Sequence, residues 1–133
     1  MTQILTPATG RNHGLARLSE HDGVPVLWFR SRLPGRPPTQ DTILRFFASG
    51  FTRTTATVSN LIVDLDGVAL LDSTALSSLI AKREQLASIG GRLALCGISS
   101  PRLREILHIT CIDQILLLAA DRGEAAGLIR QRD

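Results

Sequence analysis

Residues 61–65, Leu-Ile-Val-Asp-Leu, form an almost unbroken apolar run, which constrains the fold more than any other part of the chain. A strand with one face in water alternates apolar and polar residues, whereas a strand covered on both faces is apolar nearly throughout. We therefore predict a central buried strand at this position. Residues 92–98 form a second segment of this kind. Residues 115–118 form a short third apolar run, which fits a last strand but does not by itself distinguish a strand from a helix.

A helical pattern separates the first two of these strands. From Thr74 onward, apolar residues recur at intervals of three and four, and the pattern stops at Gly90-Gly91. The recurring residues are Leu76, Leu79, Ile80, Leu86 and Ala87. This spacing predicts a helix of about four turns that opens at Asp72-Ser73-Thr74.

Three more helices are predicted from their start signals. Asp41 or Thr42 is placed to cap a helix that runs to about residue 48, after which residues 51–57 form a connector. Ser99-Ser100-Pro101 opens another helix, and Asp121 starts a terminal helix that runs to about residue 129. The residues of the middle helix expected to face the core are Leu103, Ile106, Leu107 and Ile109.

The pattern at the start of the domain predicts an antiparallel hairpin. Residues 15–18 and 24–29 are the two strands, and residues 19–23 between them contain the Asp-Gly pair of a tight turn. Residues 31–40 contain three prolines and a glycine, so they form a loop. A hairpin followed by alternating helices and strands predicts an α/β fold, with a mixed sheet and right-handed crossovers.

Length and composition limit the kind of protein. A chain of 133 residues is one domain by size, and we divide it into a tail, residues 1–14, and a domain, residues 15–133. No apolar run approaches the roughly 20 residues that a membrane span needs. The N-terminal segment lacks the basic start and long apolar centre of a secretory signal. We therefore expect a cytoplasmic protein that does not insert into a membrane.

The charge gives little support to nucleic-acid binding. The formal net charge is +3, and Lys82 is the only lysine among 15 basic residues. The basic residues are scattered along the chain, as on an ordinary solvated surface. Only Arg30, Arg32 and Arg36 gather, in the proline-rich loop. That loop is either a surface for an acidic partner or simply a loop.

Cysteines and histidines do not form a recognisable site. Cys96 and Cys111 each lie in an apolar stretch, so we expect two buried free thiols. His13, His21 and His108 share no metal-ligand spacing. We predict neither a metal nor a cofactor.

The acidic turn after the central strand resembles the nucleophile loop of haloacid-dehalogenase-type phosphatases. In that family the first Asp of a DxD motif is the nucleophile and the second is the acid/base, and Asp64 and Asp66 would fill these roles. The family's loop, however, has one fewer residue between the glycine and the following Asp-Ser pair. No paired acids follow Gly67 to hold magnesium. We therefore predict no catalytic residues and no enzyme, and keep a DxD-type phosphatase only as the third interpretation.

The same residues resemble the STAS family, the sulphate-transporter and anti-sigma-antagonist domains. STAS domains carry a pattern like VVLDLSGVxFIDSSGL, and the chain aligns to it without a gap from Val63 through Leu76. The matching residues are Asp64, Leu65, Gly67, Val68, Leu71, Asp72, Ser73, Thr74 and Leu76. The resemblance covers roughly residues 15–129. It implies a single STAS-type domain, with a mixed sheet and about four helices packed against it.

The resemblance also implies a function. In the antagonists of this family, the unphosphorylated form binds an anti-sigma factor with serine kinase activity, and phosphorylation of the serine after the Asp reverses binding. Carried over, the acceptor is Ser73, with Thr74 as the alternative, and a serine phosphatase is a further candidate partner. The residues expected to contact the partner are Asp66, Asp72, Ser73, Thr74, Ala75 and Ser77.

Other interpretations remain open at this point. Ser73 or Asp72 would serve equally well as a plain helix N-cap. A STAS domain can also be a subunit of a phospholipid-type transporter or signalling complex that works without phosphorylation. The chain departs from the family pattern at three places: Ala75 replaces a usual Gly, Asp66 replaces Ser or Asn, and residues 31–34 replace Gly-x-Leu-Asp.

Overall fold

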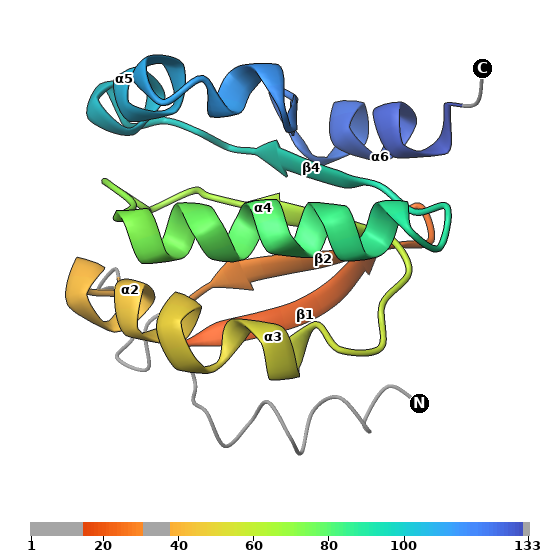
Figure 1. Ribbon diagram of the computed structural model, residues 1–133, viewed down its shortest axis with the longest axis horizontal. Coiled ribbons are helices and arrows are strands. Elements are labelled where there is room, and N and C mark those ends of the chain that lie inside the picture. The colour runs from red at the N-terminus through yellow and green to blue at the C-terminus, as the bar shows by residue number, and fades with distance from the viewer. Residues whose placement is uncertain (1–14, 31–37, 132–133) are drawn as a thin grey trace.

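The computed structural model describes residues 15–30 and 38–131, and within them a five-stranded sheet forms the centre of the molecule (Figure 1). The strands lie side by side in chain order, β1-β2-β3-β4-β5. Their bounds are β1 Ala16–His21, β2 Val24–Phe29, β3 Leu61–Asp64, β4 Leu93–Cys96 and β5 Leu117–Leu118. The first pair is antiparallel and the other three pairs are parallel, which confirms the predicted mixed sheet.

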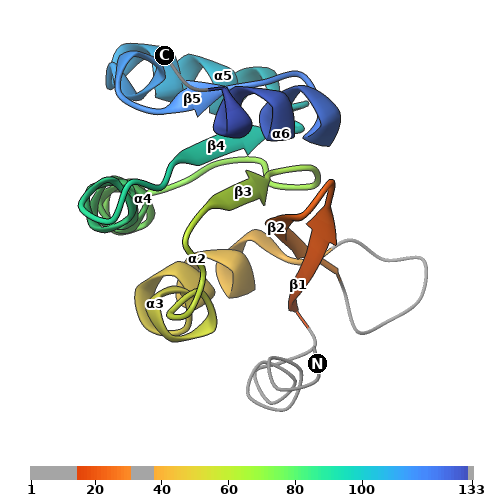
Figure 2. The same ribbon diagram turned by 90° about the vertical axis from the view of Figure 1, so that its right-hand side faces the viewer.

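Helices cover both faces of the sheet (Figure 2). The connecting helices pack on one face, and the last helix packs on the other. Their bounds are α2 Gln40–Ser49, α3 Phe51–Thr54, α4 Ser73–Ala87, α5 Pro101–Ile109 and α6 Arg122–Arg130, with a 3-10 turn η2 at Ile112–Gln114. Strands β2 to β5 are parallel and lie in chain order, so right-handed crossovers between them bring all connecting helices to the same face of the sheet.

Strand β3 is buried from both sides, as its apolar run predicts. Leu61 and Val63 belong to the core under the connecting helices, where Phe51 is also fully buried. Ile62 faces the opposite way and packs in a smaller core with Ile129 of α6. Burial of apolar surface, at about 25 cal/mol per Å², therefore anchors β3 from both faces of the sheet.

The N-terminal hairpin is longer than predicted. Strand β1 continues to His21, and its pairing with β2 leaves only Asp22 and Gly23 in the turn. Both turn residues have positive φ, 52° and 81°, as a type I′ turn requires. The prediction that residues 19–23 form the connection was therefore wrong for Ser19 to His21, because the Asp-Gly pair alone completes the turn.

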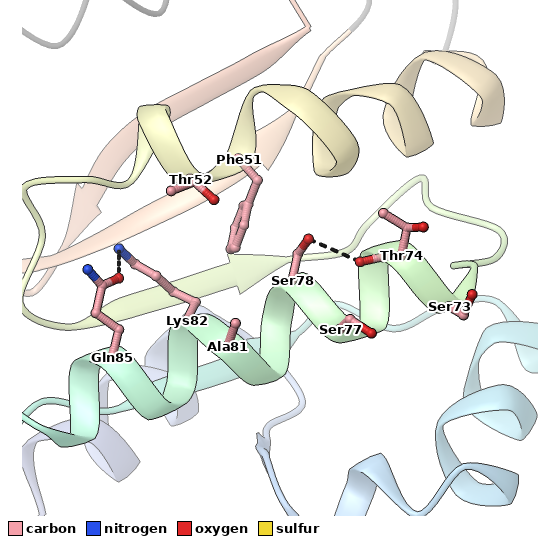
Figure 3. Close-up of a pocket in the computed structure, with 9 residues that line it drawn as sticks. All are labelled: Phe51, Thr52, Ser73, Thr74, Ser77, Ser78, Ala81, Lys82 and Gln85. Carbon is pink, nitrogen blue, oxygen red and sulfur yellow. Dashed lines mark hydrogen bonds between the residues drawn. The ribbon is translucent and has the colours of Figure 1, made fainter.

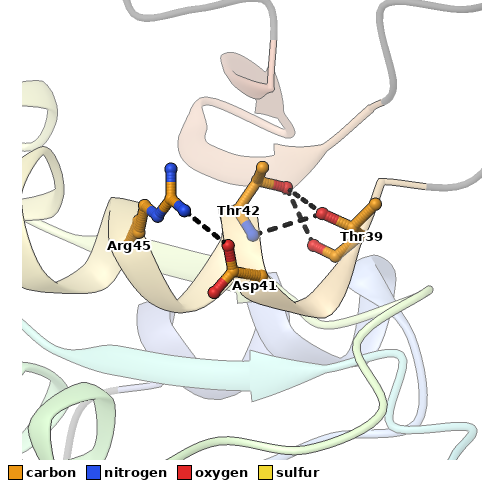
Figure 4. A network of polar contacts seen from close by, with 4 residues as sticks. All are labelled: Thr39, Asp41, Thr42 and Arg45. Atoms are coloured by element: carbon orange, nitrogen blue, oxygen red, sulfur yellow. Dashed lines mark hydrogen bonds and ion pairs between the residues drawn. The ribbon is translucent and has the colours of Figure 1, made fainter.

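Thr39 caps helix α2, and the prediction of Asp41 or Thr42 was wrong (Figure 4). The Thr39 hydroxyl accepts the Thr42 N–H at 3.3 Å. Asp41 lies instead in the first turn, where it forms an ion pair with Arg45 at 2.8 Å. Because the side chains of Asp41 and Arg45 are 71% and 76% exposed, this pair adds at most a few tenths of a kcal/mol.

Three other expectations need correction. Residues 51–54 of the predicted connector form the short helix α3, because Phe51 turns into the core. Ile109 is 68% exposed rather than buried, since α5 ends there and the chain turns away. Cys111 is also exposed, in a left-handed turn at φ 62°, whereas Cys96 is buried as predicted.

The tail of residues 1–14 and the loop positions 31–37, with Arg32 and Arg36, lie outside the described residues. Among the helices of residues 15–30 and 38–131, none has the length and apolar character that a membrane crossing requires.

Two glycines provide a test of the packing. A Cβ at Gly91 would overlap the backbone carbonyl of Ser59, whereas a Cβ at Gly127 in α6 meets open space. We expect Gly91→Ala to lower the free energy of unfolding by about 2 kcal/mol or more. We expect Gly127→Ala to raise it by about 0.5–1 kcal/mol, because alanine favours the helix. Urea denaturation of both variants measures this; equal effects would contradict the packing around β4.

Candidate functional site

The turn after β3 is held in one conformation. The Val68 N–H donates to the Leu65 carbonyl at 2.9 Å, and Gly67 has a φ of 86°, which only glycine adopts readily. Gln40 of α2 binds the turn twice: its Nε2 donates to the Gly67 carbonyl at 3.1 Å, and its Oε1 accepts the Ala69 N–H at 2.7 Å. The turn therefore delivers the chain to α4 along a fixed path.

Asp72 caps helix α4. Its backbone is extended, and its carboxylate accepts the Ala75 N–H at 2.9 Å. Ser73 is thus the first residue of the helix, and its exposed hydroxyl is not the capping group. The structure decides between the two cap candidates that the sequence left open, because Asp72 fills the role.

A groove of about 620 Å³ begins at Ser73 and runs along α4 beside α3 (Figure 3). Its lining is mostly hydroxyl, amide and small apolar groups. The lining residues are Phe51, Thr52, Ser73, Thr74, Ser77, Ser78, Ala81, Lys82 and Gln85. The groove therefore offers a continuous surface along most of α4 rather than a closed cavity.

The structure brings together three of the six predicted contact residues in this groove. Ser73, Thr74 and Ser77 are exposed and line it. Asp72 is exposed at its end without lining it, and Ala75 is fully buried, so its side chain is not accessible to a partner. Ala75 serves the site only through the N–H that Asp72 caps.

Asp66 lies elsewhere, at a second depression of about 650 Å³ near the carboxyl ends of β3 and β4. The neighbouring Asp64 has both carboxylate oxygens engaged. One accepts the Arg122 Nε at 2.8 Å and the other accepts the Asp66 N–H at 3.0 Å. The Arg122 guanidinium also lies 5.7 Å from the Trp28 ring centroid. Asp64 thus joins β3 to α6, a structural role that differs from the nucleophile of the DxD interpretation.

Cys96 lies beside this ion pair. Burial, and after it the Asp64 carboxylate, raises the pKa of the Cys96 thiol to about 12. The thiol is therefore protonated at neutral pH and a poor nucleophile. No group of three or more potential metal ligands occurs within residues 15–30 and 38–131.

Lys82 lines the groove and is not among the residues that the sequence predicts for the site. It is only 3% exposed, and its Nζ donates to the Thr55 carbonyl at 2.6 Å and to the Gln85 Oε1 at 2.9 Å. Burial lowers the pKa of this lysine. The available signal was its spacing, because Thr74, Ser78 and Lys82 follow one another at four-residue intervals on one helix face.

The fold and the site define a small mixed α/β domain that presents a serine at the exposed start of a capped helix. The model of the STAS domain family matches residues 19–125, and the chain belongs to this family. A search of curated proteins gave no significant sequence match.

Solved structures of STAS proteins share this fold. A STAS domain protein from Planctomyces limnophilus, described as an anti-sigma-factor antagonist, superposes with a TM-score of 0.70 at 23% identity, covering 87% of this chain and 98% of that one. An anti-sigma factor antagonist from Mycobacterium paratuberculosis gives a TM-score of 0.66 at 22% identity, covering 87% and 93%.

The cap of α4 can be tested directly. We expect Asp72→Ala to lower the free energy of unfolding by about 1 kcal/mol, because the Ala75 N–H loses its acceptor. Asp72→Asn keeps an oxygen at the same place and should cost much less. Asp66→Ala is the matched control, since Asp66 is exposed and lies outside the helix. Equal stability of the three variants in urea denaturation would contradict the cap.

Proposed function

We propose that this protein is an anti-sigma factor antagonist whose unmodified α4 N-terminus binds an anti-sigma factor with serine kinase activity. Phosphorylation of Ser73 by that partner ends the complex, and a serine phosphatase restores the binding form. The exposed Ser73 hydroxyl at the first position of α4, with the cap supplied by Asp72, is the observation that carries the proposal. Family membership and the two antagonist folds support it. The proposed activity places the protein in the cytoplasm.

The position of Ser73 suits a switch that acts through surface charge. A phosphate adds about −1.5 to −2 charges. At the start of a helix, that charge lies near free N–H groups and the positive end of the helix dipole, so α4 tolerates it. The switch then changes the surface offered to the partner and leaves the fold intact.

Ser73 is the preferred acceptor over Thr74. Both side chains are exposed, but Thr74 lies further inside the groove, next to Ser78. The Ser78 Oγ lies 3.0 Å from the Thr74 carbonyl oxygen and 3.2 Å from the Phe47 carbonyl oxygen. Its single hydrogen is shared between these two acceptors, which ties this turn of α4 to α2. Ser73 lies before this contact, at the first position of α4.

One observation favours a second candidate, a STAS subunit of a transporter or signalling complex without a phosphorylation cycle. Ala75 stands where phosphorylatable relatives usually have Gly, and its methyl group is fully buried beneath the helix start. Co-purification with an ATP-binding transporter subunit, from cells in which Ser73 carries no phosphate, would favour this candidate.

Substitutions at Ser73 test the proposed switch against a purified candidate anti-sigma factor. We expect Ser73→Ala to bind as the wild type does and to take up no phosphate from ATP. We expect Ser73→Glu to bind at least about tenfold more weakly, a change of about 1.4 kcal/mol, because a fixed charge occupies the docking end. Isothermal titration calorimetry and phosphopeptide mass spectrometry give the two readouts.

Two further variants serve as controls. Gly127→Glu adds the same charge on α6, which packs on the other face of the sheet, and should bind normally. Thr74→Ala should still be phosphorylated. Wild-type affinity of Ser73→Glu, or wild-type phosphorylation of Ser73→Ala, would refute the switch.

A further inference from the structure

The groove beside α4 contains a single charged residue. Of its nine lining residues, only Lys82 has a charged side chain, and no carboxylate is among them. Lys82 is also the only lysine of the chain, in which arginine supplies every other basic side chain. The one positive charge in the groove is therefore a compact ammonium group and not a planar guanidinium.

Lys82 lacks a counter-ion among the described residues. Its side chain is 3% exposed, and its two hydrogen-bond partners, the Thr55 carbonyl and the Gln85 amide oxygen, are neutral. An ammonium group has three N–H donors, so these two acceptors leave one donor for another group. A buried cation that only neutral oxygens solvate keeps an unmet attraction for an anion.

We propose that the groove binds an acidic segment of a protein partner, and that a carboxylate of that segment pairs with Lys82. The groove runs along α4, and apolar Phe51 and Ala81 line it together with hydroxyl groups. Such a long surface with both kinds of groups suits a peptide segment better than a free ion. This inference rests on the proposed function, since the same groove begins at Ser73.

With an acidic segment in the groove, a phosphate on Ser73 would act on that segment and not on Lys82. Ser73 and Lys82 are nine residues apart on α4, roughly 13 Å at 1.5 Å per residue, so a phosphate on Ser73 does not reach Lys82. It adds negative charge to the other end of the groove instead. An acidic segment is then attracted at Lys82 in the unmodified protein and repelled at Ser73 in the phosphorylated one.

The single lysine allows a direct test that needs no natural partner. Protein labelled with ε-¹³C-lysine gives one lysine signal by NMR, which belongs to Lys82. The probes are two blocked peptides at millimolar concentration, Ac-Ala-Leu-Glu-Leu-Ala-NH₂ and its Gln counterpart. We expect the Glu peptide to shift the signal saturably and to raise the pKa of Lys82, and the Gln peptide to do neither. Equal effects of the two peptides, or none from either, would overturn the proposal.

A matched pair of variants extends the test. Lys82→Met removes the buried charge and keeps an apolar stem, whereas Arg83→Met removes the same charge from the next residue, which does not line the groove. We expect Lys82→Met to bind the Glu peptide at least about tenfold more weakly, and Arg83→Met to bind it as the wild type does. Similar losses in both variants would show a general charge effect and contradict a site at Lys82. The NMR arm uses wild-type protein, so it stands even if Lys82→Met folds poorly.

The two proposals fail in different ways. If a candidate anti-sigma factor binds wild type and Lys82→Met equally, the groove pairing is wrong and the antagonist function stands. If the Glu peptide binds selectively but Ser73→Glu leaves partner binding unchanged, the acidic-segment site stands and the switch is wrong.

Discussion

Burial of β3 on both faces of the sheet determines where the site lies. Leu61 and Val63 pack under the connecting helices, and Ile62 packs against α6, so β3 has one position in the sheet. The chain leaves its carboxyl end through a turn that Gln40 holds, and α4 must return over the covered face. The helix start is consequently exposed beyond the carboxyl end of β3, where Asp72 caps it.

The carboxyl end of β3 makes a structural contact, whereas the start of α4 presents the proposed phosphorylation site. Asp64, at the end of the strand, is engaged by Arg122 and by the Asp66 N–H, and it holds α6 to the sheet. Ser73, at the start of the helix, is exposed and not needed as a cap. A modification at Ser73 therefore changes the surface without breaking an interaction that the fold requires.

Much of this arrangement could be predicted from the sequence, because local signals determine it. The apolar run of β3 and the start signals at Asp72, Ser100 and Asp121 each identify an element, and the structure has side-chain caps at all three. The cap at Thr39 was missed, since Asp41 and Thr42 offer the same chemistry two and three residues later.

The groove could not be predicted in this way. It depends on how α3 packs beside α4, and α3 forms only because Phe51 finds a place in the core. The spacing puts Lys82 on the same helix face as Thr74 and Ser78, but it does not show that the lysine is buried without a carboxylate beside it. The exposure of Ile109 likewise reflects where α5 ends and the chain turns, which its apolar spacing does not reveal.

The phosphate content of Ser73 in partner-bound and free protein tests the central claim most directly. Protein from its own cells would be separated into these two fractions and digested with trypsin, and the peptide of residues 54–82 would be quantified by mass spectrometry. We expect unmodified Ser73 in the bound fraction and phosphorylated Ser73 in the free fraction. Equal phosphate in both fractions, or none in either while the partner is still released, would contradict it.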